Sequence, residues 1–332
     1  MVRSLVGLLA AATLAGPAGA VDPGYWQALR AVDARMATIA WRLQTANAPL
    51  CRALQPAPGL QLHAVDQYAG DAEAEARATF GFATPVQVEA VAPGSPAALA
   101  GIVADDGLVA VNGEPAPRPG PASAGTSATR DAADALIARQ PADRPLVLTL
   151  QRAGGTRTVS VPATPGCRSA FEVLLGPGLT AKSDGRIVQV GVRFFETLPD
   201  DKIAAIVAHE LSHTILDHRA RLEAAGAHWG LLAEFGRDGQ LFRRTEDDAD
   251  RLSVHLLRNA GYDPQAAVRF WREDGGSIDG GPFRGASHGS ARARADAIAA
   301  EIATLPPPGR PDPAPAVLAT RDQPLSAVAP RP

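Results

Sequence analysis

The chain has 332 residues, of which 46% are hydrophobic and 20% are charged, and its formal net charge at neutral pH is -3. These values are ordinary for a globular protein, and the length leaves room for two domains. Because no long basic run is present, we expect no nucleic acid among its partners.

The first twenty residues predict a secretory signal peptide. Arg3 supplies a positive charge, residues 5–15 form an apolar run too short to span a bilayer, and residues 18–20 read Ala-Gly-Ala, a small-residue cleavage site. We therefore expect cleavage after Ala20 and a periplasmic or secreted protein, with no transmembrane segment afterwards. An uncleaved N-terminal anchor is the alternative.

Residues 21–75 predict a helical segment that packs on the C-terminal core. Asp22 and Pro23 are typical of a helix cap followed by a first-turn proline, and the helix should end before Pro49. Apolar residues recur at helical spacing and predict a core-facing stripe. They are Trp26, Leu29, Val32, Met36, Ile39 and Leu43.

Cys51 and Cys167 are the two cysteines. In an exported protein such a pair predicts a disulfide. By the chain-entropy model, a link that closes so long a loop raises the free energy of unfolding by about 4–5 kcal/mol. Two buried free thiols are the alternative.

Residues 76–165 are β-rich. A strand at 86–91 precedes residues 95–102 (SPAALAGI) and 108–113 (LVAVNG), and two later strands are joined by a turn at residues 154–155. The series resembles a PDZ domain of the bacterial protease type.

The PDZ resemblance implies that Phe80, Gly81 and Phe82 form the loop that binds the carboxylate of a peptide, which would add a strand to the sheet. Pro85 interrupts the next strand and cannot donate a ladder hydrogen bond. A purely structural or gating module is therefore the alternative.

Residues 209–213 (HELSH) lie in an apolar segment that predicts a helix. Histidines four residues apart lie about 40° apart around a helix, so His209 and His213 can bind one metal ion while Glu210 accepts a proton. Downstream, Glu246 and Asp250 share a helix face. Glu246 can be the third ligand, and Asp250 can accept the free ring N–H of a ligating histidine. The alternative is a chance motif on an amphipathic helix.

A further histidine close to this motif, and the C-terminal tail, complete the sequence pattern. His218 follows His213 by five residues, about 140° around a continuing helix, so we expect a structural role for it. Residues 306–332 are rich in Pro and Ala and predict a disordered tail.

The order HELSH, EDDAD (246–250) and AGYDP (260–264) resembles the gluzincin zinc metallopeptidases of the HtpX, BepA and CAAX prenyl protease family. Residues 181–190 resemble the edge strand of that family, along which an extended substrate lies. His288 and Arg294 resemble its histidine-containing loop and trailing arginine.

This resemblance implies an α+β fold, in which residues 166–305 form a mostly helical zincin-type peptidase core with a small edge sheet and the PDZ-like domain is an insertion. One zinc ion would be held by the two histidines and Glu246, with Glu210 as general base. His288 and Arg294 would stabilise the oxyanion, or His288 would cap the metal and keep the enzyme latent. A disulfide between Cys51 and Cys167 would link the two borders of the insertion.

The expected function is therefore a zinc endopeptidase whose partners are protein or peptide substrates, namely exported or misfolded envelope proteins. A PDZ scaffold or chaperone with a latent or vestigial metal site is the first alternative. A zinc hydrolase of a non-peptide amide is the second.

Overall fold

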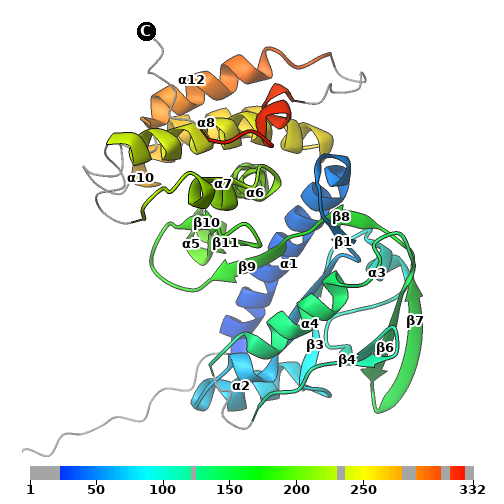
Figure 1. Ribbon diagram of the computed structural model, residues 1–332. Coiled ribbons are helices and arrows are strands. Elements are labelled where there is room, and N and C mark those ends of the chain that lie inside the picture. Colours follow the sequence, from blue (N-terminus) through cyan, green and yellow to red (C-terminus); the bar gives the residue numbers. More distant parts are fainter. Residues whose placement is uncertain (1–22, 121–124, 230–235, 279–288, 308–314, 326–332) are drawn as a thin grey trace, which may run out of the picture.

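Figure 1 shows the computed structural model of the chain, a mixture of helices and sheets as the sequence predicts. The predicted signal peptide and His288 lie outside the described residues. The structure describes residues 23–120, 125–229, 236–278, 289–307 and 315–325.

The long helix α1 (Pro23–Ala46) runs between a helical part and a β-rich part of the molecule (Figure 1). Its apolar stripe faces the interior as predicted, with Leu29 and Val32 only partly buried. Met36, Ile39 and Leu43 join the core of the helical part, whereas Trp26 packs with Phe80 and other aromatic rings beside the β-rich part. One helix thus contributes side chains to two cores and holds the two parts together.

The helical part is built around α6 (Asp200–Ile215) and α8 (Gly236–Asn259), which pack against each other. Its core is apolar, and α6 contributes Ile203, Val207 and Leu211 as fully buried side chains. The remaining helices here are α5 (Val192–Thr197), α7 (His218–Ala224), α9 (Gln265–Glu273), α10 (Gly275–Ile278) and α12 (Ala291–Ile302).

A three-stranded sheet in the order β10-β11-β9 lies beside α6. β10 is antiparallel to β11, and β9 is parallel to it. Each outer strand has one edge that pairs with no other described strand. The strands are β9 (Ala170–Leu174), β10 (Ala181–Ser183) and β11 (Ile187–Gly191).

The β-rich part is a sheet in the order β2-β3-β4-β6-β7, with β5 paired to β4 and with α3 and α4 packed around it. It has its own core, which includes Leu62, Val88 and Leu148. Its elements are β2 (Leu60–Ala64), β3 (Val86–Val91), α3 (Pro96–Leu99), β4 (Gly107–Val111), β5 (Glu114–Pro115), α4 (Ala128–Ala138), β6 (Leu146–Arg152) and β7 (Gly155–Val161).

Two details of the β-rich part differ from the sequence prediction. The sheet begins at β2, at residue 60 rather than 76, because η2 (Val65–Gln67) and α2 (Asp71–Phe80) are inserted between its first two strands. The hairpin turn consists of Ala153 and Gly154, one residue earlier than predicted. Both have positive φ, as a two-residue turn of this hand requires.

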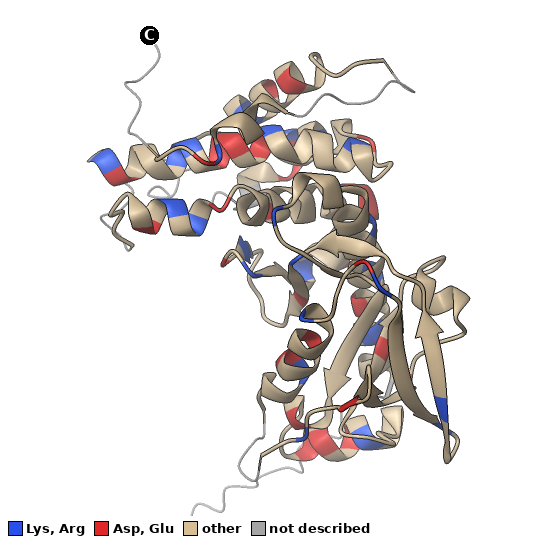
Figure 2. Ribbon diagram, turned by 45° about the vertical axis from the view of Figure 1, so that its right-hand side comes forward, with Lys and Arg blue, Asp and Glu red and all other residues tan. Residues whose placement is uncertain are grey.

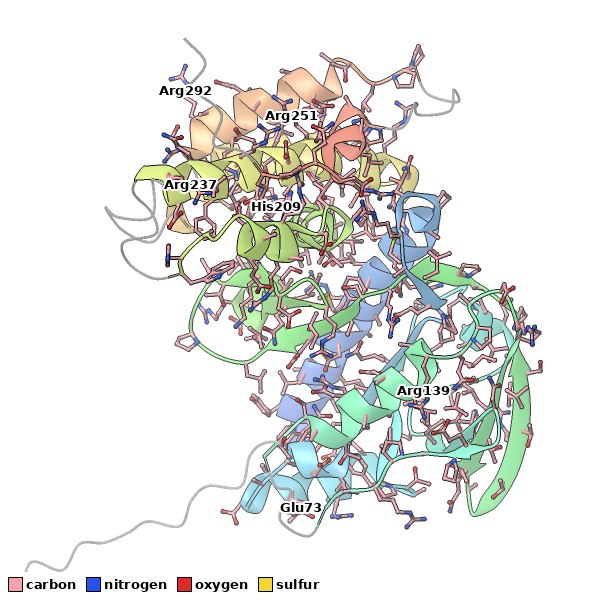
Figure 3. The ribbon with its side chains drawn as sticks, viewed as in Figure 1. Glu73, Arg139, His209, Arg237, Arg251 and Arg292 are labelled. Atoms are coloured by element: carbon pink, nitrogen blue, oxygen red, sulfur yellow. A yellow bond between two sulfur atoms is a disulfide. The ribbon has the colours of Figure 1, made fainter. Side chains whose placement is uncertain are left out.

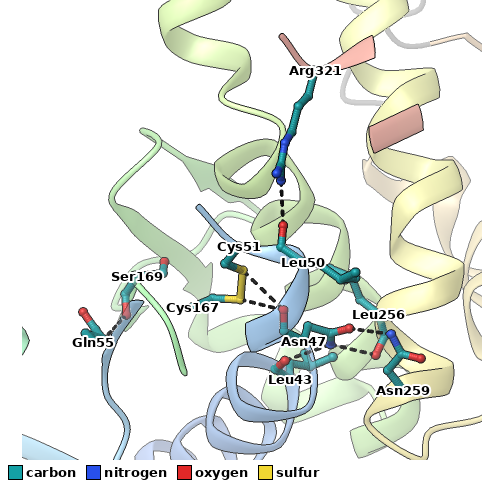
Figure 4. Close-up of a disulfide and its surroundings, with 10 residues drawn as sticks. All are labelled: Leu43, Asn47, Leu50, Cys51, Gln55, Cys167, Ser169, Leu256, Asn259 and Arg321. Carbon is teal, nitrogen blue, oxygen red and sulfur yellow. Dashed lines mark hydrogen bonds between the residues drawn. A yellow bond between two sulfur atoms is a disulfide. The ribbon is translucent and has the colours of Figure 1, made fainter. Parts of the chain in front are cut away.

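The predicted disulfide between Cys51 and Cys167 is present, with 5.4 Å between the two Cα atoms (Figure 4). Next to it, β1 (Leu54–Pro56) pairs antiparallel with β8 (Pro165–Cys167). Cys51 directly follows the short helix η1 (Ala48–Leu50). The covalent link and the two-stranded sheet therefore close the borders of the inserted β-rich part.

The prediction of a disordered tail is wrong for residues 315–325, which pack on the helical part. η4 (Ala316–Thr320) contacts α8, and Arg321 donates a hydrogen bond to the carbonyl of Leu50 (Figure 4). Leu325 is 5% exposed in a cluster with Leu222 and Leu241. These apolar side chains find a partner surface that composition alone does not reveal.

Charged residues of both signs are interspersed along the chain in both parts of the molecule (Figure 2). Among the helices of the described residues, none combines the length and the apolar character needed to cross a bilayer.

Candidate metal centre and PDZ groove

The candidate metal-binding motif lies on α6, in the helical part of the molecule, where Figure 3 labels His209. Pro199 precedes the helix, and Asp200 and Asp201 lie in its first turn, where acidic groups are favourable to the helix dipole. The apolar face of α6 is buried, which directs His209 and His213 toward α8.

Glu246 on α8 meets both histidines. Its carboxylate oxygens lie 3.3 Å from His209 Nε2 and 3.5 Å from His213 Nε2, and the two Nε2 atoms are 3.2 Å apart. Donors bound at about 2.0–2.2 Å to a tetrahedral zinc ion are about 3.4 Å from one another. Two imidazole nitrogens and the carboxylate of Glu246, which turns one oxygen toward each of them, therefore fit a zinc ion.

A layer of buried polar groups supports the three donors. Asp250 Oδ1 lies 2.9 Å from His209 Nδ1, as expected if it accepts the ring N–H. Arg294 donates two hydrogen bonds of 2.7 Å to Asp250, its Nη2 lies 3.4 Å from Glu246, and its guanidinium stacks 3.8 Å over the ring of Trp271. In this arrangement Arg294 holds the two carboxylates.

The electrostatics of the three donors suit a cation. Burial lowers the pKa of His213 to about 4 and so keeps this ring neutral. Burial opposes charge on Glu246, but the neighbouring His213 and His209 hold its pKa well below the usual range. Burial also opposes charge on His209, yet hydrogen bonds to Asp250 and Glu246 prevail and raise its pKa to about 10. A proton on His209 therefore competes with a metal ion.

Glu210 lies beside the donors in a cavity of about 530 Å³. Burial is the main reason why the pKa of Glu210 is raised to about 7, a value suited to proton transfer near neutral pH. Strand β10, whose outer edge pairs with no other described strand, lines the same cavity. The other walls are largely apolar. They include Phe194, Ile206, Leu222, Trp229, Phe242, Phe270 and Trp271.

Helical spacing predicted that His218 faces away from His213, but in the structure the two rings are in contact. His218 Nδ1 lies 2.9 Å from His213 Nδ1. The helical-wheel argument fails because α6 ends at Ile215, and Asp217 adopts a left-handed conformation with φ of 54° before α7 begins. Asp tolerates this conformation better than most residues, so Asp217 was the one sequence feature that could have indicated the break between the two helices.

Phe80, Gly81 and Phe82 do not form a peptide-binding loop. The two phenylalanine side chains are buried in an aromatic cluster with Trp26 and Tyr68, and both rings also pack against His63 of β2. They precede β3, which is paired with β2 on one side and β4 on the other. Within the described part of the chain β3 therefore lies inside the sheet, and neither of its edges is wholly free for an added strand.

The free edge next to α4 belongs to β2 instead. A cavity of about 160 Å³ lies between β2 and α4, and it is closed on its other sides by α1 and β9. The side chain of Gln55 donates a hydrogen bond of 3.0 Å to the carbonyl of Ser169, and that of Gln61 one of 3.4 Å to Phe171. The groove is therefore narrow and is bridged to the helical part.

Comparison with known protein families finds a PDZ domain over residues 87–152, which run from β3 to the end of β6. This match lies outside the residues of the candidate metal centre. None of the curated proteins compared with the chain matches it.

Proposed function

We propose that the protein is a zinc-dependent endopeptidase of the gluzincin type that acts on exported or misfolded envelope proteins. The observation that supports this most directly is the set of three donors, 3.2–3.5 Å apart, on His209, His213 and Glu246. They lie in one cavity with Glu210 and with an open strand edge.

A zinc ion held by these three side chains would supply a Lewis acid that polarises the scissile carbonyl and strengthens water as a nucleophile. Glu210 would accept the proton of the attacking water and pass it to the departing amine. Asp250 and Arg294 would keep His209 and Glu246 oriented. The open edge of β10 would hold an extended substrate through main-chain hydrogen bonds.

In this proposal the PDZ domain binds or gates substrates. PDZ domains bind peptides by strand addition, and the open edge of β2 beside α4 provides the place. The hydrogen bonds from Gln55 to Ser169 and from Gln61 to Phe171 of β9 favour gating, because a peptide at this edge would have to displace them.

A PDZ scaffold or chaperone with a latent or vestigial metal site is the second candidate, and the PDZ match by itself supports it equally. Cleavage of an unfolded protein distinguishes the two. The wild type should cleave it, whereas Glu210→Gln and chelator-treated protein should not. Equal activity of all three would indicate a contaminant and favour the scaffold.

A latent enzyme would be inactive in that assay, so the set should include His288→Ala. If neither the wild type nor His288→Ala cleaves any unfolded protein while both bind zinc, the endopeptidase proposal fails.

A further inference from the structure

The two candidate histidine ligands have different partners on their second ring nitrogen. His209 Nδ1 faces the carboxylate of Asp250 at 2.9 Å, which is a strong acceptor. His213 Nδ1 faces another imidazole, with 2.9 Å between it and His218 Nδ1. Because both contacts are short, each ring is oriented by one side chain from outside the donor set.

The chain is bent so that His218 reaches this position. Helix α6 ends at Ile215, the left-handed residue Asp217 reverses the backbone, and His218 is the first residue of α7. The ring of His218 therefore returns over the last turn of α6, where His213 lies. It is 1% exposed.

Burial of His218 is costly, since its Nε2 has no hydrogen-bond partner among the described residues. A buried polar atom without a partner costs about 1–3 kcal/mol, and an apolar side chain of similar size would avoid this cost. Packing alone thus gives no reason for a histidine here. The contact with His213 Nδ1 does.

A histidine that binds a metal through Nε2 carries its proton on Nδ1 and donates it to an acceptor, which fixes the tautomer and the ring plane. We propose that His218 is the positioning residue of His213, with an unprotonated Nδ1 that accepts the His213 Nδ1–H and its own proton on Nε2. A second proton on His218 would place two donors face to face. The inference rests on the proposed function, because it requires His213 to be a ligand.

Two substitutions separate this role from packing. In His218→Asn, Oδ1 stands the same number of bonds from Cα as the imidazole Nδ1 and can accept the hydrogen bond. His218→Leu fills the space without an acceptor. His255→Leu is the matched control, since His255 is a buried histidine of α8 that faces Glu301 rather than the metal centre.

The measurement is the zinc affinity of the full chain by competition with a chromophoric chelator, with thermal unfolding in chelator to show that each variant is folded. We expect His218→Leu to bind zinc about 10–100-fold more weakly than the wild type, and His218→Asn to lose much less. His255→Leu should change only the unfolding temperature.

His218→Leu binding zinc as tightly as the wild type would overturn the inference and leave the proposed function intact. Equal weakening by Asn and Leu would also overturn it, because the acceptor would then not matter. If the wild type binds no zinc, the metal centre itself is refuted.

Discussion

Asp250 contacts both His209 and Arg294. Replacing Asp250 by asparagine keeps the size of its side chain but removes the charge. In the structure Asp250 accepts from His209 Nδ1 at 2.9 Å and receives two hydrogen bonds of 2.7 Å from Arg294. The side chains of Asp250 and Arg294 are each 5% exposed. An asparagine can still accept from His209, but its amide group would then face the donors of Arg294.

The expected cost follows from this burial. Removing one partner of a buried ion pair typically costs about 3–5 kcal/mol, because the remaining charge is left without compensation. We therefore expect Asp250→Asn to lower the free energy of unfolding by about that amount in chelator. Because a neutral amide oxygen is a weaker acceptor for His209 Nδ1–H than a carboxylate, zinc binding should also weaken by about 10–100-fold.

Urea unfolding at pH 7 and chelator competition provide the two measurements. Asp247→Asn, an exposed position on the same helix, is the control and should change stability by less than about 0.5 kcal/mol. The double variant Asp250→Asn, Arg294→Met buries neither charge and should be more stable than Asp250→Asn alone. If Asp250→Asn is as stable as the control and binds zinc as well, Asp250 neither orients His209 nor compensates the charge of Arg294.

Three further predictions concern stability. Replacing Cys51 and Cys167 by serine should lower the free energy of unfolding by about 4–5 kcal/mol, because the disulfide restricts a long loop in the unfolded chain. A loss below about 1 kcal/mol in urea unfolding would contradict this. Burial and the nearby Glu89 raise the pKa of Asp33 to about 7, so its ionisation costs stability as pH rises from about 4 through 7. Asp33→Asn should therefore raise the melting temperature more at pH 8 than at pH 5, and equal shifts would contradict it. Zinc at about 100 times its Kd should raise the free energy of unfolding by about 2.7 kcal/mol, which calorimetry can measure. A melting temperature that chelation leaves unchanged would exclude a zinc site in the folded protein.

Local spacing predicted much of the candidate centre. The four-residue spacings of His209 with His213, and of Glu246 with Asp250, place each pair on one helix face, and the structure brings the two faces together. The apolar stripe of α1 was predictable for the same reason. Zinc binding and catalysis at this centre remain predictions.

Features that depend on breaks in regular structure could not be predicted in this way. His218 reaches His213 only because α6 ends and Asp217 turns the chain. The free sheet edge beside α4 belongs to β2, which pairs with β3 across the insertion of η2 and α2, and Phe80 and Phe82 pack in an aromatic core. Such interruptions are decided by tertiary packing, which the local pattern does not contain.

Zinc binding in this proposal requires two imidazoles from α6 and one carboxylate from α8 to hold a single ion. Native mass spectrometry of the purified, zinc-reloaded chain tests it most directly, with Glu246→Gln beside the wild type. We predict one zinc per wild-type chain and a strong loss of zinc from the variant. Far less than one zinc in the wild type, or equal zinc in both proteins, would contradict the account.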